Sequence, residues 1–392
     1  MQTKLNKYNL WFLASLCGFS VANIYYNQTL LRLMAIDFNI DIHRTSLLLT
    51  LTQMGYAFGL LLIVPLGDIV NRRRIIILLL IVNALVNFFS AMSISIEWLF
   101  ILSFFIGLTS ISAQIVIPAI TTISEEKERG SNVGLLMTGL FSGIIFARTL
   151  SGLMGEHYGW RYVYIMSAII DLFLIGGAII FSPQYPKGKP LSYTKTIMSL
   201  FFILRDAPSL RRSCVLGSLI FAAFCSAWGS ITILLSSSPY HYTSGVIGTF
   251  SLIGIFGTLA SSYIGKLADK KSPEFILFIS SPFMLLAFFI FGISGFSIIL
   301  CILALAIMDL SSRASFLSNQ LVNYKLPVEI RSRVNTIFMF FYFAGGALGS
   351  YIGAVEATNH GWIGVSYIGG LLSALAIILL MKKFVMGIIL KN

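Results

Sequence analysis

Charged residues are scarce in this sequence. Only 11% of its 392 residues are charged, whereas 57% are hydrophobic. Soluble domains carry roughly 25% charged residues, so this chain has too little polar surface to fold as one. Apolar stretches of about 20 residues, long enough to cross a bilayer as helices, recur along the whole length. The composition therefore predicts an all-α membrane protein with many transmembrane helices.

Cysteine and histidine are scarce as well, and common catalytic motifs do not occur. The four cysteines show no CxxC spacing, which argues against a disulfide framework and against a zinc site. The sequence has no HExxH, no GxSxG and no paired histidines within an apolar stretch. We therefore expect no enzyme: no catalytic residues, no metal and no cofactor.

Twelve apolar stretches are predicted to span the membrane. They cover residues 9–34, 46–66, 75–96, 98–121, 132–155, 161–183, 212–237, 244–264, 275–295, 297–322, 333–354 and 362–384. They form two six-helix bundles, residues 1–183 and 212–392, joined by a polar linker, 184–211. The run LSYTKTIMSLFFIL in this linker has the pattern of a short amphipathic helix on the membrane surface, although a plain linker also explains it.

Basic residues are distributed unevenly over the predicted loops. With both termini inside, the segments predicted to be cytoplasmic hold 22 of the 27 lysines and arginines. This asymmetry is the positive-inside rule. It accounts for the net charge of +12 without nucleic acid, so we expect no nucleic-acid partner and a multi-pass protein with both termini in the cytoplasm.

Two landmarks occur twice along the chain. VPLGDIVNRRR and IGKLADKKSPE place Asp68 and Asp269 201 residues apart, and EHYGWRYVY and TNHGWIGVS place Trp160 and Trp362 202 residues apart. The nearly equal offsets indicate that the two bundles are duplicates. Such a repeat is typical of transporters with a site between their halves, and a membrane enzyme or receptor, the distant alternative, does not require it.

These repeats resemble the major facilitator superfamily over the whole chain. ANIYYNQTLL, QMGYAFGLLLIVPLGDIVNRRR, AQIVIPAI and GWRYVY are similar to a bacterial drug and sugar efflux branch, the arabinose-efflux and drug:proton antiporter group. The resemblance implies a monomeric secondary transporter of the bacterial inner membrane, with a small-molecule substrate and protons as partners. It also implies a latch made by Asp68, Arg72 and Arg73 and their counterparts. The counterparts in the second half are Asp269 and Lys270. These charges could instead only anchor the topology.

Arg148 stands inside the fifth predicted span, where a charge is costly and usually faces a cavity or a partner. Many proton antiporters of this superfamily carry a Gly-Pro before a Gly-Gly in this span. Counting back from Trp160 and Arg161 places Arg148 where that proline is expected. The departure favours Arg148 as a substrate-binding residue and weakens the inference of antiport.

Other charges lie within predicted spans. Asp309 and Arg313 are four residues apart on one helix face, in a favourable order for an ion pair. We expect Asp309 and Asp171 to couple protons and Arg313 to bind substrate. In the alternative, Asp309 only neutralises Arg313, and Asp171 only pairs with Arg148.

Uncharged polar residues mark the spans that line the cavity in this fold. The predicted substrate-binding set, besides the arginines, is Asn23, Tyr26, Gln28, Gln114, Trp228 and Asn319. Such groups also serve as interhelical hydrogen bonds, worth roughly 0.6–2 kcal/mol each.

We expect proton-coupled efflux of a small neutral or acidic organic compound. Arg32, Arg148 and Arg313 would give a cationic path, so uptake of an anionic metabolite is the alternative.

Overall fold

The computed structural model describes residues 6–183, 185, 192–258, 271–327 and 330–389, without the side chains of Asp68 and of residues 382–389. Within these ranges the chain is helical and contains no strand, which confirms the predicted all-α membrane fold. Nine of the described helices are long and apolar enough to cross a membrane. The twelve predicted spans exceed this number partly because α1 is short and α15 contains the last two spans.

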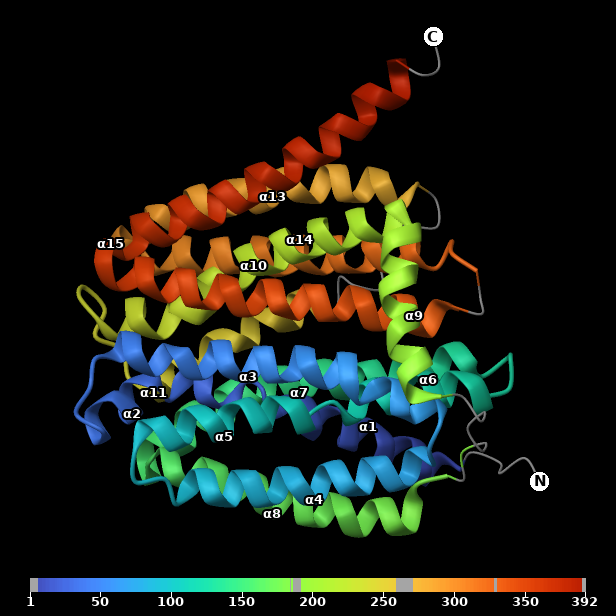
Figure 1. The fold of residues 1–392 in the computed structure, drawn as a ribbon. Helices are drawn as coiled ribbons and strands as arrows, with labels where there is room; N and C mark the ends of the chain where they lie inside the picture. Colours follow the sequence, from blue (N-terminus) through green and yellow to red (C-terminus); the bar gives the residue numbers. More distant parts are fainter. Residues whose placement is uncertain (1–5, 184, 186–191, 259–270, 328–329, 390–392) are drawn as a thin grey trace. The chain divides into compact units, whose positions relative to one another are not determined.

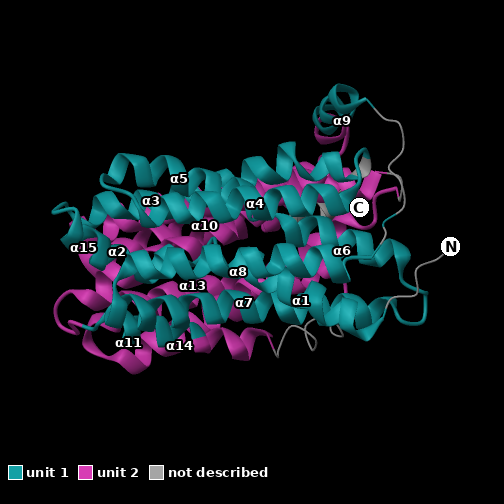
Figure 2. Cartoon of the chain, turned by 90° about the horizontal axis from the view of Figure 1, so that it is seen from below, with its two compact units in different colours: residues 1–202, 242–251 teal, residues 203–241, 252–392 magenta. Residues whose placement is uncertain are grey.

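The chain forms two compact units, coloured separately in Figure 2. Unit 1 comprises residues 1–202 and 242–251, and unit 2 comprises residues 203–241 and 252–392. The helices up to the linker are α1 (Lys7–Ala22), η1 (Tyr26–Thr29), α2 (Leu31–Asp37), α3 (Ile42–Leu62), η2 (Val64–Asp68), α4 (Arg72–Ala91), α5 (Ile96–Thr109), α6 (Ser112–Ile123), α7 (Arg129–Tyr158), α8 (Trp160–Phe181) and α9 (Tyr193–Asp206). Those that follow are α10 (Pro208–Ser236), α11 (Ser244–Thr249), η3 (Phe250–Ile253), α13 (Pro273–Gly292), η4 (Ser294–Phe296), α14 (Ile298–Asn323) and α15 (Arg331–Ile389).

The repeated Gly-Trp pair has the same structural role in both units. Gly159 has a φ of 94° and separates α7 from α8, and Gly361 has a φ of 61° inside α15. Figure 1 shows the chain doubling back in α15, which therefore consists of two helices joined at Gly361. Glycine adopts positive φ without a steric penalty, so each pair marks a sharp turn between two spans.

Two predicted spans are interrupted in the structure. The first span breaks after Ala22, where the 3₁₀ helix η1 precedes α2, and the fourth breaks between α5 and α6. At the second break, the Ser110 hydroxyl donates to the Ile106 carbonyl at 2.6 Å and the Thr109 hydroxyl donates to the Phe105 carbonyl at 2.8 Å. Such bonds from serine and threonine to the preceding turn bend helices. Hydropathy gives no sign of these interruptions.

Close helix packing depends on glycine in equivalent places of the two units. A Cβ on Gly143 of α7 would lie 2.2 Å from the Gly18 carbonyl oxygen of α1, and one on Gly349 of α15 would lie 2.1 Å from that of Ala222 in α10. Lipid tails are as apolar as the helix side chains, so the hydrophobic effect does not drive helices together in a membrane, and close packing at small residues is one of the contributions that does. These contacts fix the helices that carry the buried polar residues.

The segment 242–251 is attached to unit 1 through α7. The Thr149 hydroxyl lies 2.9 Å from the Ser251 hydroxyl, and the backbone N–H of Gly245 donates to the Glu156 carboxylate at 2.8 Å. Both contacts lie on α7 residues close to Arg148 in sequence. They hold the position of this part of α7.

Candidate functional site

Arg148 is buried in unit 1, with only 6% of its surface exposed. Its Nε donates to the Gln28 side-chain oxygen at 2.6 Å, and its guanidinium lies 4.7 Å from the centre of the Tyr25 ring. A charge-assisted hydrogen bond and a cation–π contact both stabilise a buried guanidinium. The structure therefore brings Arg148 and Gln28 of the predicted set together.

The break in the first span places Gln28 beside α7. Asn27 donates to the Thr52 hydroxyl of α3 at 3.0 Å, and the Thr29 and Ser151 hydroxyls lie 2.8 Å apart. These bonds fasten η1 to α3 on one side and to α7 on the other. Ser151 is three residues beyond Arg148, so η1 is held against the turn of α7 that carries the arginine.

Gln114 lies in α6 and hydrogen-bonds to Tyr56 of α3, which lies near Tyr25. Tyr25 is the residue that faces Arg148. The cluster around Arg148 therefore extends to α3 and α6. Sequence reasoning missed Tyr56, although a tyrosine within the apolar run QMGYAFG was a signal for it.

Asp171 belongs to a second cluster in unit 1. It is 1% exposed, and its carboxylate accepts hydrogen bonds from Asn87 at 3.3 Å and from Asn23. Tyr26 lies close enough to interact with it electrostatically. Asp171 thus has amides as hydrogen-bond partners, which differs from the alternative of an ion pair with Arg148.

The predicted residues of the first span serve both clusters. Asn23 and Tyr26 join Asp171, whereas Gln28 joins Arg148. Asn83 and Asn87, which sequence reasoning missed, complete the Asp171 cluster from α4. Their spacing of four residues in VNALVNFF puts them on one helix face and could have indicated a polar site.

Asp309 and Arg313 form the predicted ion pair in unit 2. The Arg313 Nε lies 2.7 Å from Asp309 Oδ2, and the exposed fractions of the two side chains are 16% and 8%. Arg313 also donates to the Gly254 carbonyl at 3.4 Å. A Cβ on Gly257 would lie 1.7 Å from Asp309 Oδ2, so the backbone at Gly257 packs directly on the pair.

Trp228 and Asn319 are buried in unit 2 on different helices. Trp228 of α10 is 3% exposed and packs on Phe224, with ring centres 6.2 Å apart. Asn319 of α14 donates to the Ser315 carbonyl at 3.0 Å, within its own helix. Both are placed in the bundle interior, but these contacts do not join them to the Asp309–Arg313 pair.

The structure describes only part of the predicted latch, namely Arg72 and Arg73. Arg72 donates to the Gly67 carbonyl at 2.9 Å, and Arg73 donates to the Ile179 carbonyl at the end of α8. These bonds close the turn between α3 and α4 and tie it to α8. The Asp68 side chain, Asp269 and Lys270 lie outside the described part of the chain.

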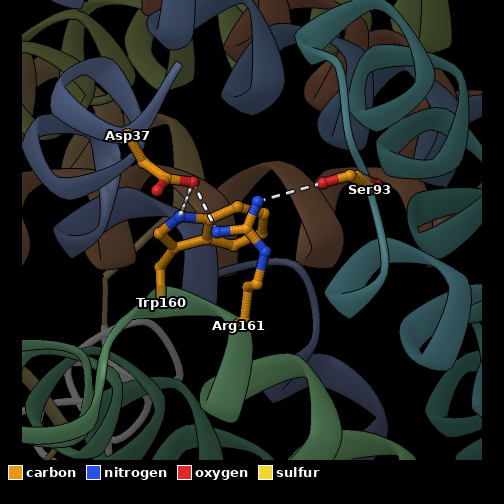
Figure 3. A network of polar contacts seen from close by, with 4 residues as sticks. All are labelled: Asp37, Ser93, Trp160 and Arg161. Atoms are coloured by element: carbon orange, nitrogen blue, oxygen red, sulfur yellow. Dashed lines mark hydrogen bonds and ion pairs between the residues drawn. The ribbon is translucent and has the colours of Figure 1, made fainter. Parts of the chain in front are cut away.

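A further polar network links the end of α2 to the start of α8 (Figure 3). Asp37 accepts hydrogen bonds from Trp160 at 3.2 Å and from Arg161, and Arg161 also donates to the Ser93 carbonyl at 3.1 Å. Part of this network lines an open cavity of about 410 Å³. Asp37 and Arg161 are 41% and 38% exposed, and exposed pairs contribute only about 0–1 kcal/mol, so the network chiefly fastens a turn.

Comparison with known proteins identifies the family. A sequence model of the protein family described as Major Facilitator Superfamily matches residues 10–324. The chain belongs to this superfamily. It is 32% identical over 371 residues to the uncharacterized transporter YgaY of Escherichia coli, covering 94% of this chain and 93% of that one. It is 24% identical to the inner membrane transport protein YnfM of Escherichia coli, covering 94% and 88%.

Solved structures show the same fold at low sequence identity. A nucleoside transporter superposes with a TM-score of 0.74 at 14% identity, covering 96% of this chain and 99% of its own. A POT family transporter in complex with 5-aminolevulinic acid gives 0.76 at 12% identity, covering 96% and 95%. This superfamily member is therefore a secondary transporter of small molecules with many membrane spans, and not an enzyme.

Proposed function

We propose that the protein exports small neutral or acidic organic compounds by alternating access, driven by protons. It acts as a monomer in a bacterial inner membrane, with both termini in the cytoplasm. The observation that carries the proposal is the buried Arg148, held by Gln28 and Tyr25 at the break in the first span. A guanidinium presents a planar fork that binds carboxylates with two hydrogen bonds, and it repels cations.

The substrate site on unit 1 extends from Arg148 to Gln114. The hydrogen bond from Nε to Gln28 fixes the plane of the guanidinium, and Tyr25 covers one of its faces. Tyr56 and Gln114 supply hydrogen-bonding groups beside them. A small organic acid or a polar neutral compound matches these groups. Asn23, Tyr26, Trp228, Arg313 and Asn319 remain candidates for other substrate contacts.

Proton coupling is assigned to Asp309. Its ion pair with Arg313 favours the carboxylate, whereas burial favours the neutral acid, so a small movement of Arg313 changes which form is stable. A proton taken up by Asp309 releases Arg313 from the pair. Asp171 is the second carboxylate proposed for proton coupling. Asp68, Arg72, Arg73, Asp269 and Lys270 form the latch that opens and closes during the cycle.

A thermal-shift screen tests the substrate assignment. Purified protein is heated with neutral, acidic and cationic compounds, and hits are repeated with Arg148→Ala. The proposal expects hits among acidic or neutral compounds, with binding at least about tenfold weaker in the variant, because hydrogen bonds to a charged group contribute about 1.5–3 kcal/mol. Arg44→Ala, which removes an exposed arginine, is the matched control. Cationic hits that survive Arg148→Ala would refute the proposal.

Uptake of an anionic metabolite is the second candidate. The same observation supports it, because Arg148 places positive charge inside unit 1, and Arg313 does so in unit 2 once Asp309 has taken up a proton. Direction distinguishes the two candidates. Accumulation of an acidic hit in right-side-out vesicles under an inward proton gradient indicates uptake, whereas accumulation in inverted vesicles with an acidic interior indicates export.

A further inference from the structure

The open cavity of unit 1 has both charged and apolar walls. It measures about 410 Å³ and is lined by residues 158–162, at the turn between α7 and α8, together with Leu33, Ile36 and Asp37 of α2. A Cβ on Gly159 would meet nothing within 4 Å, so the backbone of this turn is open as well. Pockets that bind small molecules measure roughly 300–1,000 Å³. The cavity therefore has room for a ligand, and the substrate site proposed around Arg148 does not include it.

Asp37 and Arg161 keep spare hydrogen-bonding groups beside this cavity. Asp37 accepts from Trp160 at 3.2 Å and from Arg161 through the same oxygen, Oδ2 (Figure 3). Within the described part of the chain, no group donates to its other oxygen, Oδ1. Arg161 donates one N–H to Asp37 and one to the Ser93 carbonyl, and a guanidinium has five. The bonds that fasten the turn thus leave one carboxylate oxygen and three N–H groups for a ligand.

The two charges are held in fixed positions. The central carbon of the Arg161 guanidinium lies 4.3 Å from the centre of the Trp160 ring and 5.8 Å from that of the Phe38 ring. Contact with aromatic rings and the bond to Ser93 restrict the side chain, so it loses little entropy when it forms further hydrogen bonds. The bond from Trp160 restricts Asp37 in the same way. A carboxylate and a guanidinium side by side match a ligand that carries both a cationic and an anionic group.

Exposed apolar side chains surround these charges. Ile36 is 67% exposed and follows Leu33 by three residues, so both lie on one face of α2. Tyr158 and Tyr162 are 69% and 53% exposed, one on each side of the turn. Tyrosines at the ends of membrane spans gather at the level of the lipid headgroups. A small soluble zwitterion would leave Leu33 and Ile36 uncovered, whereas a phospholipid with its headgroup in the cavity would cover them with its glycerol and acyl chains.

We propose that this cavity binds the headgroup of a zwitterionic phospholipid of the ethanolamine type. The phosphate accepts hydrogen bonds from Arg161, and the primary ammonium donates to Asp37 Oδ1; both bonds join charged groups and are therefore strong. Phosphatidylglycerol has no cation for Asp37, and a choline headgroup has no N–H to donate. The proposal goes beyond the transport assignment, because lipid binding requires neither Arg148 nor a transported compound.

Lipid binding to the purified, delipidated full-length protein tests the proposal. Phosphatidylethanolamine, phosphatidylcholine and phosphatidylglycerol with identical acyl chains are titrated into the protein in detergent, and bound lipid is measured by native mass spectrometry. We expect the ethanolamine lipid to bind at least about tenfold more tightly than the other two. Asp37→Asn should remove most of this preference. Ile36→Trp should abolish it, because the larger side chain occupies the cavity and leaves both charges in place.

Arg44→Ala is the matched control. It removes another exposed ion pair of unit 1, the one with Glu97, and should bind the three lipids as the wild type does. Thermal unfolding gives a second readout: the ethanolamine lipid should raise the midpoint of the wild type and of Arg44→Ala, but not that of Ile36→Trp. Equal binding of the three lipids, or a preference that Asp37→Asn and Ile36→Trp both retain, would show that the proposal is wrong. Soluble O-phosphoethanolamine that binds as tightly as the lipid would overturn it too, since the ligand would then be a free zwitterion.

Discussion

At the scale of single residues, the two buried charges of unit 1 lie in different surroundings. Arg148 contacts an amide oxygen and an aromatic ring, both of which stabilise a cation. Asp171 accepts hydrogen bonds from amides in a cluster rich in oxygen. The first span contributes to both clusters because η1 interrupts its helix. One short break in a helix therefore positions two candidate sites.

Gln28→Glu tests the role of Arg148 directly. The new carboxylate would lie where Gln28 Oε1 now accepts from Arg148 Nε at 2.6 Å, and would neutralise the guanidinium. We expect unchanged or higher thermal stability, together with a loss of binding of acidic compounds of at least about tenfold. Gln28→Leu is the contrasting variant and should cost about 1.5–3 kcal/mol of stability, because it removes a hydrogen bond to a charged group. Retention of acidic ligands by Gln28→Glu would contradict the assignment.

Gly257→Ala tests how tightly unit 2 holds its ion pair. The added Cβ would lie 1.7 Å from Asp309 Oδ2, so the pair must move. We expect a loss of about 1–3 kcal/mol of stability from overpacking. In an Asp309→Ala background the same change should cost much less, because the obstructing atom is gone. Additive losses in thermal unfolding of the two single variants and the double variant would show that Gly257 and Asp309 do not contact.

The candidate sites could be predicted from the sequence only in part. Arg148, Asp171 and the Asp309–Arg313 pair were visible because a charge within an apolar run is rare and costly. Asn83 and Asn87 were not, because neutral polar residues in membrane helices commonly serve only as interhelical hydrogen bonds, and their partner Asp171 lies 84 residues beyond Asn87. The sequence also gave no indication that Asn23 and Gln28 would serve different clusters.

At the scale of helices, the apolar stretches predict the spans well but not their interruptions. The break between α5 and α6 depends on hydroxyl groups bonded to backbone carbonyls, which hydropathy does not represent. The linker helix α9, Tyr193–Asp206, was predictable because its apolar residues recur with helical spacing. Turns at Gly159 and Gly361 were visible as a repeated Gly-Trp pair, although only the structure shows their positive φ.

Two glycines of α7 give a matched test of helix packing. Gly143→Ala would bring a Cβ to 2.2 Å from the Gly18 carbonyl oxygen, whereas a Cβ on Gly134 meets nothing within 4 Å. We expect Gly143→Ala to separate α1 from α7 and to cost about 1–3 kcal/mol or more. Gly134→Ala should be neutral or stabilising by up to about 1 kcal/mol, since alanine favours the helix. Equal unfolding midpoints for the two variants would argue against close packing of α1 on α7.

At the scale of the whole molecule, the duplicated plan and the family membership agree. The two Gly-Trp turns and the two glycine contacts recur at equivalent places in the halves. Members of this superfamily move small molecules, and the relatives named above are transporters. Membership of the superfamily does not determine which compound this protein transports. That assignment depends on Arg148 and on the hydrogen-bonding groups around it.

Proton movement in inverted membrane vesicles tests the central assignment most directly. The vesicles are energised to an acidic interior, and the pH gradient is followed while an acidic hit from the thermal-shift screen, or the cationic dye ethidium, is added. We predict that the acidic compound collapses part of the gradient in the wild type and in Arg44→Ala, but not in Arg148→Ala. A response to ethidium that Arg148→Ala leaves unchanged would contradict the account.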